Sequence, residues 1–195
     1  MSPPDLVREI YNPVFDDTVT FKKFSAKTEG AYTLLEIDLG PGGGNIPQFH
    51  QRFKETFIPI KNTLGVEYEG EEYFLEPGEE ITAHERETLR FSNPTDERII
   101  FQVRIEPVSA GFEKALYLIC GLVQDGKMHE DGRFKDFNHT ALFVKLSDTQ
   151  APGMTNLIKP FLKRSARKIE ESGEADSLLQ KYYFNNTRPN DMKVE

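Results

Sequence analysis

Residues 42–93 decide the fold, and they read GGGNIPQFHQRFKETFIPIKNTLGVEYEGEEYFLEPGEEITAHERETLRFSN. A glycine-rich turn opens the stretch, and a strand is predicted to begin at His50. Further turn signals follow at Gly70 and at Pro77, and Asn93 ends the segment. Glycine and proline between short apolar runs indicate short strands joined by tight turns. The segment therefore predicts a β-rich structure.

The flanking segments show the two-residue period of half-buried strands. Residues 66–75 predict a hairpin around the turn at Glu69 and Gly70, because glycine supplies the positive φ that tight hairpin turns need. Two longer strands are expected over residues 32–39 and 98–106. One face of the first strand holds Thr33, Leu35, Ile37 and Leu39, and one face of the second holds Ile99, Phe101, Val103 and Ile105. The sequence does not decide which face of the second strand looks inward.

The order of these motifs resembles the cupin superfamily, in particular small bacterial cupin-domain proteins with a C-terminal helical extension. The resemblance implies a mainly β fold, a double-stranded β-helix or jelly-roll barrel. Cupins usually hold a divalent metal inside the barrel through an HxH pair, a glutamate a few residues on and a third histidine past the PG turn. Here His50 and Arg52 occupy the pair, Glu55 matches the glutamate, and Leu89 stands where the third histidine is expected.

The two replacements argue against a bound metal. The guanidinium of Arg52 has no free lone pair and would repel a divalent cation, and Leu89 offers no donor. His50 and Glu55 alone fall short of the three protein ligands that such sites normally have. We therefore expect no metal and no other cofactor. If a metal does bind, His84 is the candidate that would join His50 and Glu55.

The same geometry suggests a different use for the site. Side chains alternate along a strand, so His50 and Arg52 are both expected to face the barrel interior, with Glu55 rejoining them after a slight bend. An arginine inside a partly dry barrel needs a partner, which could be Glu55 or the carboxylate or phosphate of a ligand. A buried network and a ligand site both stay open. The expected ligand-binding residues are His50, Arg52, Glu55, Phe57, Leu89 and Phe91.

The period becomes helical after Pro107. Ser109 is a candidate cap for a helix whose apolar stripe holds Phe112, Leu116, Ile119 and Val123. Further helices are expected over residues 140–146, from about 155 to 171 and from Glu174 onward. The sequence thus predicts a cupin barrel with an N-terminal arm over residues 1–107, and a helical extension over 108–195 that packs on the barrel or on a partner subunit.

Three classes of function remain open, and the sequence does not decide whether the protein is an enzyme. The first is a protein that binds an anionic metabolite in a barrel with an eroded metal site. The second is a metal-free isomerase, dehydratase or lyase in which His50 moves the proton, Glu55 orients it and Arg52 holds an anionic group. The third is a structural or membrane-peripheral protein that acts through a basic amphipathic helix bearing Lys159, Lys163, Arg164, Arg167 and Lys168.

Composition and charge bound the remaining possibilities. The 195 residues are 37% apolar and 29% charged, as in an ordinary globular protein. Residues 1–107 hold 20 Asp and Glu against 11 Lys and Arg, a net charge of −9, and residues 108–195 hold 12 against 13, a net charge of +1. An acidic barrel argues against nucleic-acid binding. The absence of a long apolar run or a signal segment leads us to expect a cytoplasmic protein.

Two further expectations concern Cys120 and the quaternary structure. Cys120 is the single cysteine and lies in an apolar run, so we expect a buried structural thiol. The resemblance to cupins implies a homodimer.

Overall fold

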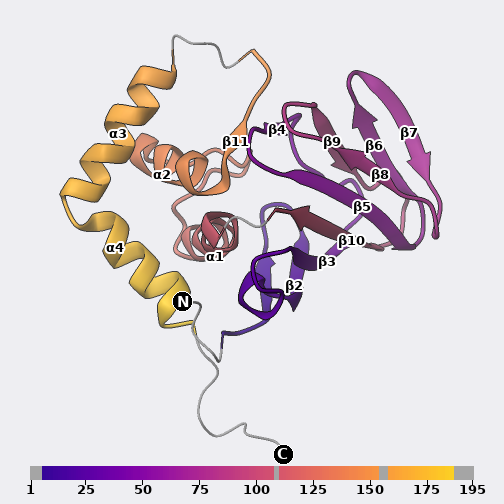
Figure 1. The fold of residues 1–195 in the computed structure, drawn as a ribbon, viewed down its shortest axis with the longest axis horizontal. Helices are drawn as coiled ribbons and strands as arrows, with labels where there is room; N and C mark the ends of the chain where they lie inside the picture. Colours follow the sequence, from indigo (N-terminus) through magenta and orange to yellow (C-terminus); the bar gives the residue numbers. More distant parts are fainter. Residues whose placement is uncertain (1–5, 108–109, 154–157, 187–195) are drawn as a thin grey trace, which may run out of the picture.

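A computed structural model describes residues 6–107, 110–153 and 158–186 of the chain. The strands gather on one side of the molecule and the α-helices on the other (Figure 1). Within these ranges, no helix combines the length and the apolar character needed to span a membrane.

The strands form two antiparallel sheets and one short ribbon. The larger sheet runs in the order β1 (Glu9–Asn12), β2 (Asp17–Lys23), β3 (Thr33–Leu39), β10 (Ile99–Glu106), β5 (Lys54–Lys61) and β8 (Ile81–Ala83). The smaller sheet holds β7 (Glu71–Leu75), β6 (Leu64–Tyr68) and β9 (Leu89–Ser92). In the ribbon, β4 (Phe49–His50) pairs with β11 (Thr149–Gln150), which lies almost 100 residues further along the chain.

The two sheets enclose one hydrophobic core, as the predicted jelly-roll barrel requires. Phe91 of β9 lies between the sheets, with ring-centroid distances of 6.0 Å to Phe57 of β5 and 5.2 Å to Phe101 of β10. Burial alternates residue by residue along β3 and β10, and the faces that hold Leu35 and Phe101 are the ones turned inward. The two strand predictions are therefore confirmed.

The predicted hairpin is also confirmed. β6 and β7 pair so that Tyr68 faces Glu71, and the turn residues Glu69 and Gly70 have φ values of 51° and 86°. Glycine adopts this left-handed backbone conformation without steric cost.

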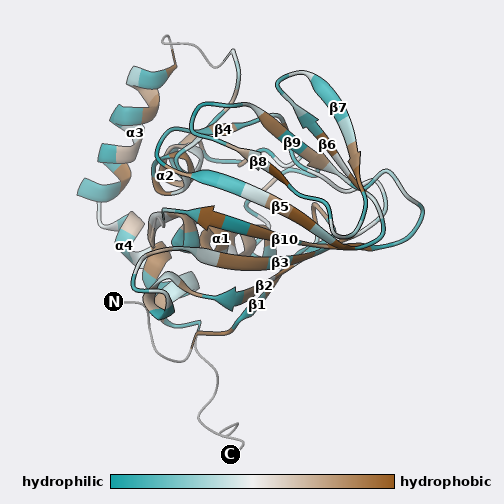
Figure 2. Ribbon diagram, turned by 45° about the vertical axis from the view of Figure 1, so that its right-hand side comes forward, coloured by the Kyte–Doolittle hydropathy of each residue, from teal (hydrophilic) through white to brown (hydrophobic). Residues whose placement is uncertain are grey.

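The helical part forms two layers beside the barrel. Helices α1 (Ala110–Gln124) and α2 (Phe137–Ser147) lie next to the strands, and α3 (Lys159–Glu171) and α4 (Glu174–Leu179) lie outermost (Figure 1). A π-helical turn, η2 (Gln180–Phe184), continues α4, and a short 3₁₀ turn, η1 (Ser25–Lys27), follows β2. Hydrophilic and hydrophobic residues alternate along α3, as expected of an amphipathic surface helix (Figure 2).

The helix boundaries differ from the prediction in one place. Helix α2 begins at Phe137, three residues earlier than predicted, because the carboxylate of Asp136 caps it by accepting a 2.7 Å hydrogen bond from the backbone N–H of Asn138. The proposed cap Ser109 and the predicted start of α3 near Thr155 fall outside the described residues.

Helix α1 is buried on two sides, whereas the sequence predicts a single apolar stripe. Phe112 and Cys120 join the barrel core, while Leu118 and Leu122 are fully buried in a second cluster with α2, α4 and η2. Leu116 and Ile119 of the predicted stripe stay half-buried. The thiol of Cys120 is buried as expected, and this burial raises its pKa to about 12.

A buried carboxylate fixes α1 against the barrel. Glu113 is fully buried and accepts three hydrogen bonds: from the backbone N–H of Ser25 at 2.7 Å, from the Ser25 hydroxyl at 3.1 Å and from the Thr33 hydroxyl at 2.7 Å. A buried charged group is tolerated when several donors satisfy it in this way. Glu113 therefore connects α1 to β3 and to η1.

Replacing Glu113 by alanine should lower the free energy of unfolding by about 2–4 kcal/mol, because three donors would lose their acceptor inside the core. Urea denaturation followed by circular dichroism measures the change. The control is Glu171→Ala, which removes an exposed glutamate paired with Arg167 at 3.5 Å and should cost at most about 0.5 kcal/mol. Equal effects of the two substitutions would contradict the anchoring role of Glu113.

Candidate functional site

His50 and Glu55 form a buried pair where β4 leads into β5. Their exposed fractions are 4% and 6%, and the imidazole Nε2 lies 3.4 Å from a carboxylate oxygen of Glu55. The His50 ring stacks on Phe53 with a centroid distance of 4.3 Å and meets the edge of Phe112 from α1. The structure thus brings together the two candidate catalytic residues of the sequence.

The environment of His50 favours its protonated form. Burial lowers the pKa of the imidazole, but the Glu55 carboxylate, with smaller contributions from Asp148 and the Ser147 backbone, outweighs burial, and the pKa of His50 is raised. His50 therefore offers Glu55 a positive charge from within the protein.

Arg52 does not face the barrel interior, and this part of the prediction is wrong. Its side chain is 58% exposed, and its Nε lies 3.3 Å from the carboxylate of Asp148. The alternation of side chains holds only along a continuous strand, whereas β4 ends at His50 and the chain bends at residues 51–52. Asp148 stabilises the bend by also accepting a 2.8 Å hydrogen bond from the backbone N–H of Gln51.

Of the other expected ligand-binding residues, two line a cavity and one does not. Phe57 and Phe91 line the large cavity described below, together with Glu55. Leu89 is only 2% exposed and belongs to the hydrophobic core, and it is not part of the cavity wall.

The residues present do not fit the metal of the cupin pattern. His50 and Glu55 contact each other, and His84 is exposed, with its backbone N–H donating to Glu87 at 2.7 Å. Within the part of the chain that the structure describes, His50, Glu55 and His84 do not form a cluster of metal-ligating atoms. The structure therefore does not bring His84 together with His50 and Glu55 as ligands of one metal ion.

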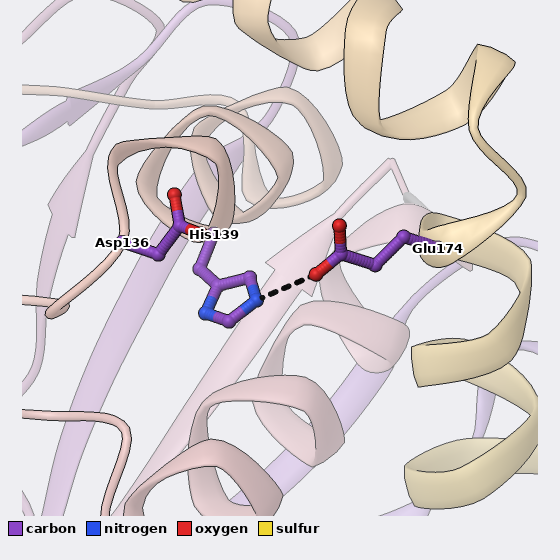
Figure 3. A group of neighbouring side chains, drawn as sticks. All are labelled: Asp136, His139 and Glu174. Atoms are coloured by element: carbon purple, nitrogen blue, oxygen red, sulfur yellow. Dashed lines mark hydrogen bonds and ion pairs between the residues drawn. The ribbon is translucent and has the colours of Figure 1, made fainter.

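A cluster with metal-like spacing occurs elsewhere, in the helical part. Ligand atoms of Asp136, His139 and Glu174 lie within 4.8 Å of one another (Figure 3). Two of these side chains already have clear structural roles: Asp136 caps α2, and Glu174 pairs with Nε2 of the buried His139 at 3.3 Å, which joins α2 to α4. The observed contacts explain the cluster as a connection between helices.

A cavity of about 870 Å³ lies between the barrel and the helices. The inner faces of β2, β3, β5 and β10 form one wall, and α1, α2 and the loop before α2 form the other. Apolar and aromatic side chains make up most of the lining: Val19, Leu35, Ile37, Phe57, Phe91, Val103, Phe112, Leu116, Ile119, Phe134, Phe137, Phe143 and Val144. This explains why Leu116 and Ile119 are half-buried, since they face the cavity.

Asp17 is the polar group that the sequence analysis missed. It lines the cavity, and its Oδ1 is buried without a hydrogen-bond partner among the described residues. Burial, reinforced by the neighbouring carboxylate of Asp16, raises its pKa from 3.8 to about 6, against the opposing effects of its own backbone hydrogen bond and of Arg98. A carboxyl with a strongly raised pKa in a cavity is typical of a functional site.

A sequence signal for Asp17 does exist. Val19 and Phe21 are the buried residues of β2, and Asp17 is in phase with them at the start of the strand. An acidic residue at an inward position of a period-two pattern contradicts the usual polarity and marks a candidate site.

No protein-family model matches the chain, and no curated protein matches it. Solved structures resemble it, each over about half of its length. An RmlC-like cupin from Shewanella frigidimarina is 14% identical, covering 54% of this chain and 88% of its own, with a TM-score of 0.47. A predicted oxalate decarboxylase from Thermotoga maritima is 14% identical, with coverages of 54% and 95% and a TM-score of 0.47. The polyketide cyclase RemF from Streptomyces resistomycificus is 20% identical, with coverages of 52% and 71% and a TM-score of 0.43.

The strand order and the turn motifs of the chain itself give it the antiparallel barrel of the cupin fold. Its barrel is followed by a helical extension. The likeness concerns the fold and leaves the chemistry of the cavity to be argued from the side chains of this chain.

Replacing Asp17 by asparagine should stabilise the protein at pH 8 and have little effect at pH 4. Because its pKa is higher in the folded than in the unfolded chain, ionised Asp17 costs stability, and this cost appears as the pH rises from about 4 to above 6. At pH 8 the gain should be about 1–3 kcal/mol. Thermal denaturation at both pH values measures it, with the exposed Asp96→Asn as the control. Equal stability of wild type and D17N at pH 8 would contradict the raised pKa.

Proposed function

We propose that the protein binds a largely apolar small molecule in the cavity between its barrel and its helices. The observation that supports this most directly is the apolar, aromatic lining of a cavity of about 870 Å³. That volume lies in the upper part of the range typical of ligand pockets, which are mostly apolar with a few polar groups to orient the ligand. Asp17 and Asn45, whose Nδ2 is buried without a partner among the described residues, are candidates for those polar contacts.

The anionic metabolite expected from the sequence has less support. Arg52, which motivated it, is outside the cavity. The cations of the cavity lining already have partners: Arg90 lies 3.7 Å from Glu67, Arg133 lies 2.7 Å from Asp131, and Lys135 donates to the carbonyl of Gly126 at 2.8 Å. An apolar ligand fits the lining better than an anion does.

The test uses 1-aminoanthracene, an uncharged dye at neutral pH whose emission rises in an apolar site. We expect saturable binding with a dissociation constant on the order of 10 μM, because most of the dye surface would be buried. Ile119→Phe places extra volume in the cavity and should weaken binding about tenfold or more. The matched control is Ile60→Phe, at a position 48% exposed, which should leave binding unchanged.

Two outcomes would count against the proposal. The first is the lack of any saturable rise in emission with folded wild-type protein. The second is equal binding by I119F and I60F, since dye bound elsewhere on the surface would not respond to the volume of the cavity.

A second candidate function is acid/base catalysis on the bound molecule. It is favoured by the position of Glu55 in the cavity wall with His50 directly behind it, an arrangement in which the pair can exchange a proton with a ligand. Mass spectrometry of a bound compound after incubation tests it. Conversion by wild type and loss of conversion in Glu55→Gln, with retained dye binding, would support catalysis, and unchanged recovery of the compound would favour simple binding.

Homodimer formation, cytoplasmic localisation and membrane binding through α3 stay predictions. The inward face of α3 packs on its neighbours through Leu162, Ala166 and Ile169, while Phe161 beside the basic residues is 67% exposed.

A further inference from the structure

Asp17 and its neighbour Asp16 differ in one decisive respect. Asp16 accepts a 3.0 Å hydrogen bond from Arg98 and one of 3.3 Å from the hydroxyl of Tyr11. Asp17 points its Oδ1 into a buried position without a partner among the described residues. Arg98 therefore binds Asp16 directly, whereas Asp17, at the cavity, feels the charge of Arg98 only from a distance.

Among the described residues, no cation forms an ion pair with Asp17, although Arg98 and the hydrogen bond from its own backbone lower its pKa. Arg98 is bound to Asp16 and to Asp38, at 2.6 Å from the latter, and does not line the cavity. Cys120 of α1 faces Asp17, and its thiol is neutral because burial raises its pKa to about 12. An unpaired carboxylate in apolar surroundings is costly, so it persists where it has a role.

The other two acidic groups of the cavity lining have partners of their own, and Asp131 lies 2.7 Å from Arg133. Glu55 lies 3.4 Å from His50, whose pKa is raised, so the imidazole can balance the negative charge of Glu55. Asp17 is therefore the one acidic group of the barrel interior, within the described residues, that would gain most from a cation brought by a ligand. The aromatic lining would assist, since ring faces attract cations in dry surroundings.

We propose that the ligand of this cavity is an apolar amine whose protonated nitrogen pairs with Asp17 while its hydrophobic body fills the space between α1 and the barrel. This inference rests on the proposed binding function and narrows the class of ligand. The ammonium group of the ligand would form the ion pair that Asp17 lacks within the protein. Ligand binding would thereby stabilise the ionised carboxylate and the folded protein.

The experiment compares three probes with the same ring system: 2-naphthalenemethylamine, 2-naphthalenemethanol and 2-naphthoic acid, which are cationic, neutral and anionic at pH 7.5. Each displaces 1-aminoanthracene from the full-length protein, and the displacement gives its affinity. We expect the amine to bind at least about tenfold more tightly than the alcohol, and the acid to bind more weakly than both, because buried charge pairs are worth a kcal/mol or more.

Asp17→Asn should remove the preference. The amine should lose about tenfold or more in affinity while the alcohol stays within about twofold, whereas the exposed Asp96→Asn should change neither. In wild type, the advantage of the amine should shrink as the pH falls below about 6, because Asp17 then becomes protonated before it can pair.

The outcomes separate this inference from the function on which it rests. Dye binding with equal affinities of amine and alcohol, or a preference that survives in D17N, would overturn the amine while leaving apolar ligand binding intact. Tightest binding of the acid would overturn it in favour of an anionic ligand. Failure of the dye itself to bind would remove both proposals.

Discussion

The hydrogen bonds to the buried carboxylate of Glu113 are the interaction on which the rest of the structure depends. Hydrophobic contacts alone would let α1 slide or settle more deeply onto the barrel, because they have no preferred direction. Three donors from Ser25 and Thr33 fix one residue of the helix at one height. Helix α1 is therefore held at a distance at which Leu116 and Ile119 line a cavity, instead of filling it.

The pairing of β4 with β11 joins the segment after α2 to the barrel, and Thr149 of this segment also lines the cavity. Thr149 lies beside His50 in this ribbon, so the segment that follows α2 is joined to the strand that carries His50. Asp148, in the same segment, stabilises the bend after β4 by binding Gln51 and Arg52. The segment that follows α2 thus stabilises the arrangement of β4 and of the bend after it.

The sequence could predict what local patterns encode. The alternation along β3 and β10 and the turn at Gly70 each depend on neighbouring residues, and the sequence predicts both, although it does not say which face of β10 is buried. Arg52 was predicted with the wrong orientation because its direction depends on Asp148, which is 96 positions away in the numbering of the chain. The cavity was beyond prediction for a related reason, since empty space depends on how far apart α1 and the barrel are held, and no periodicity records that distance. Asp17 is intermediate, because its inward phase in β2 is visible in the sequence while its lack of a partner is not.

The charges of the interior indicate where a ligand would be recognised in a barrel whose described side chains do not form the metal site of the cupin pattern. In the cupin pattern the glutamate is a ligand of a divalent cation, which supplies its counter-charge. Here Glu55 lies 3.4 Å from His50 and raises its pKa, which favours the charged imidazole. The counter-charge of Glu55 therefore comes from the protein itself. Asp17 lines the same cavity near Cys120 of α1 and, among the described residues, has no directly paired cation. A charge without a paired partner in apolar surroundings gives the strongest electrostatic selectivity. A ligand would therefore be recognised at Asp17, on the side that the helical extension covers, rather than at His50 and Glu55.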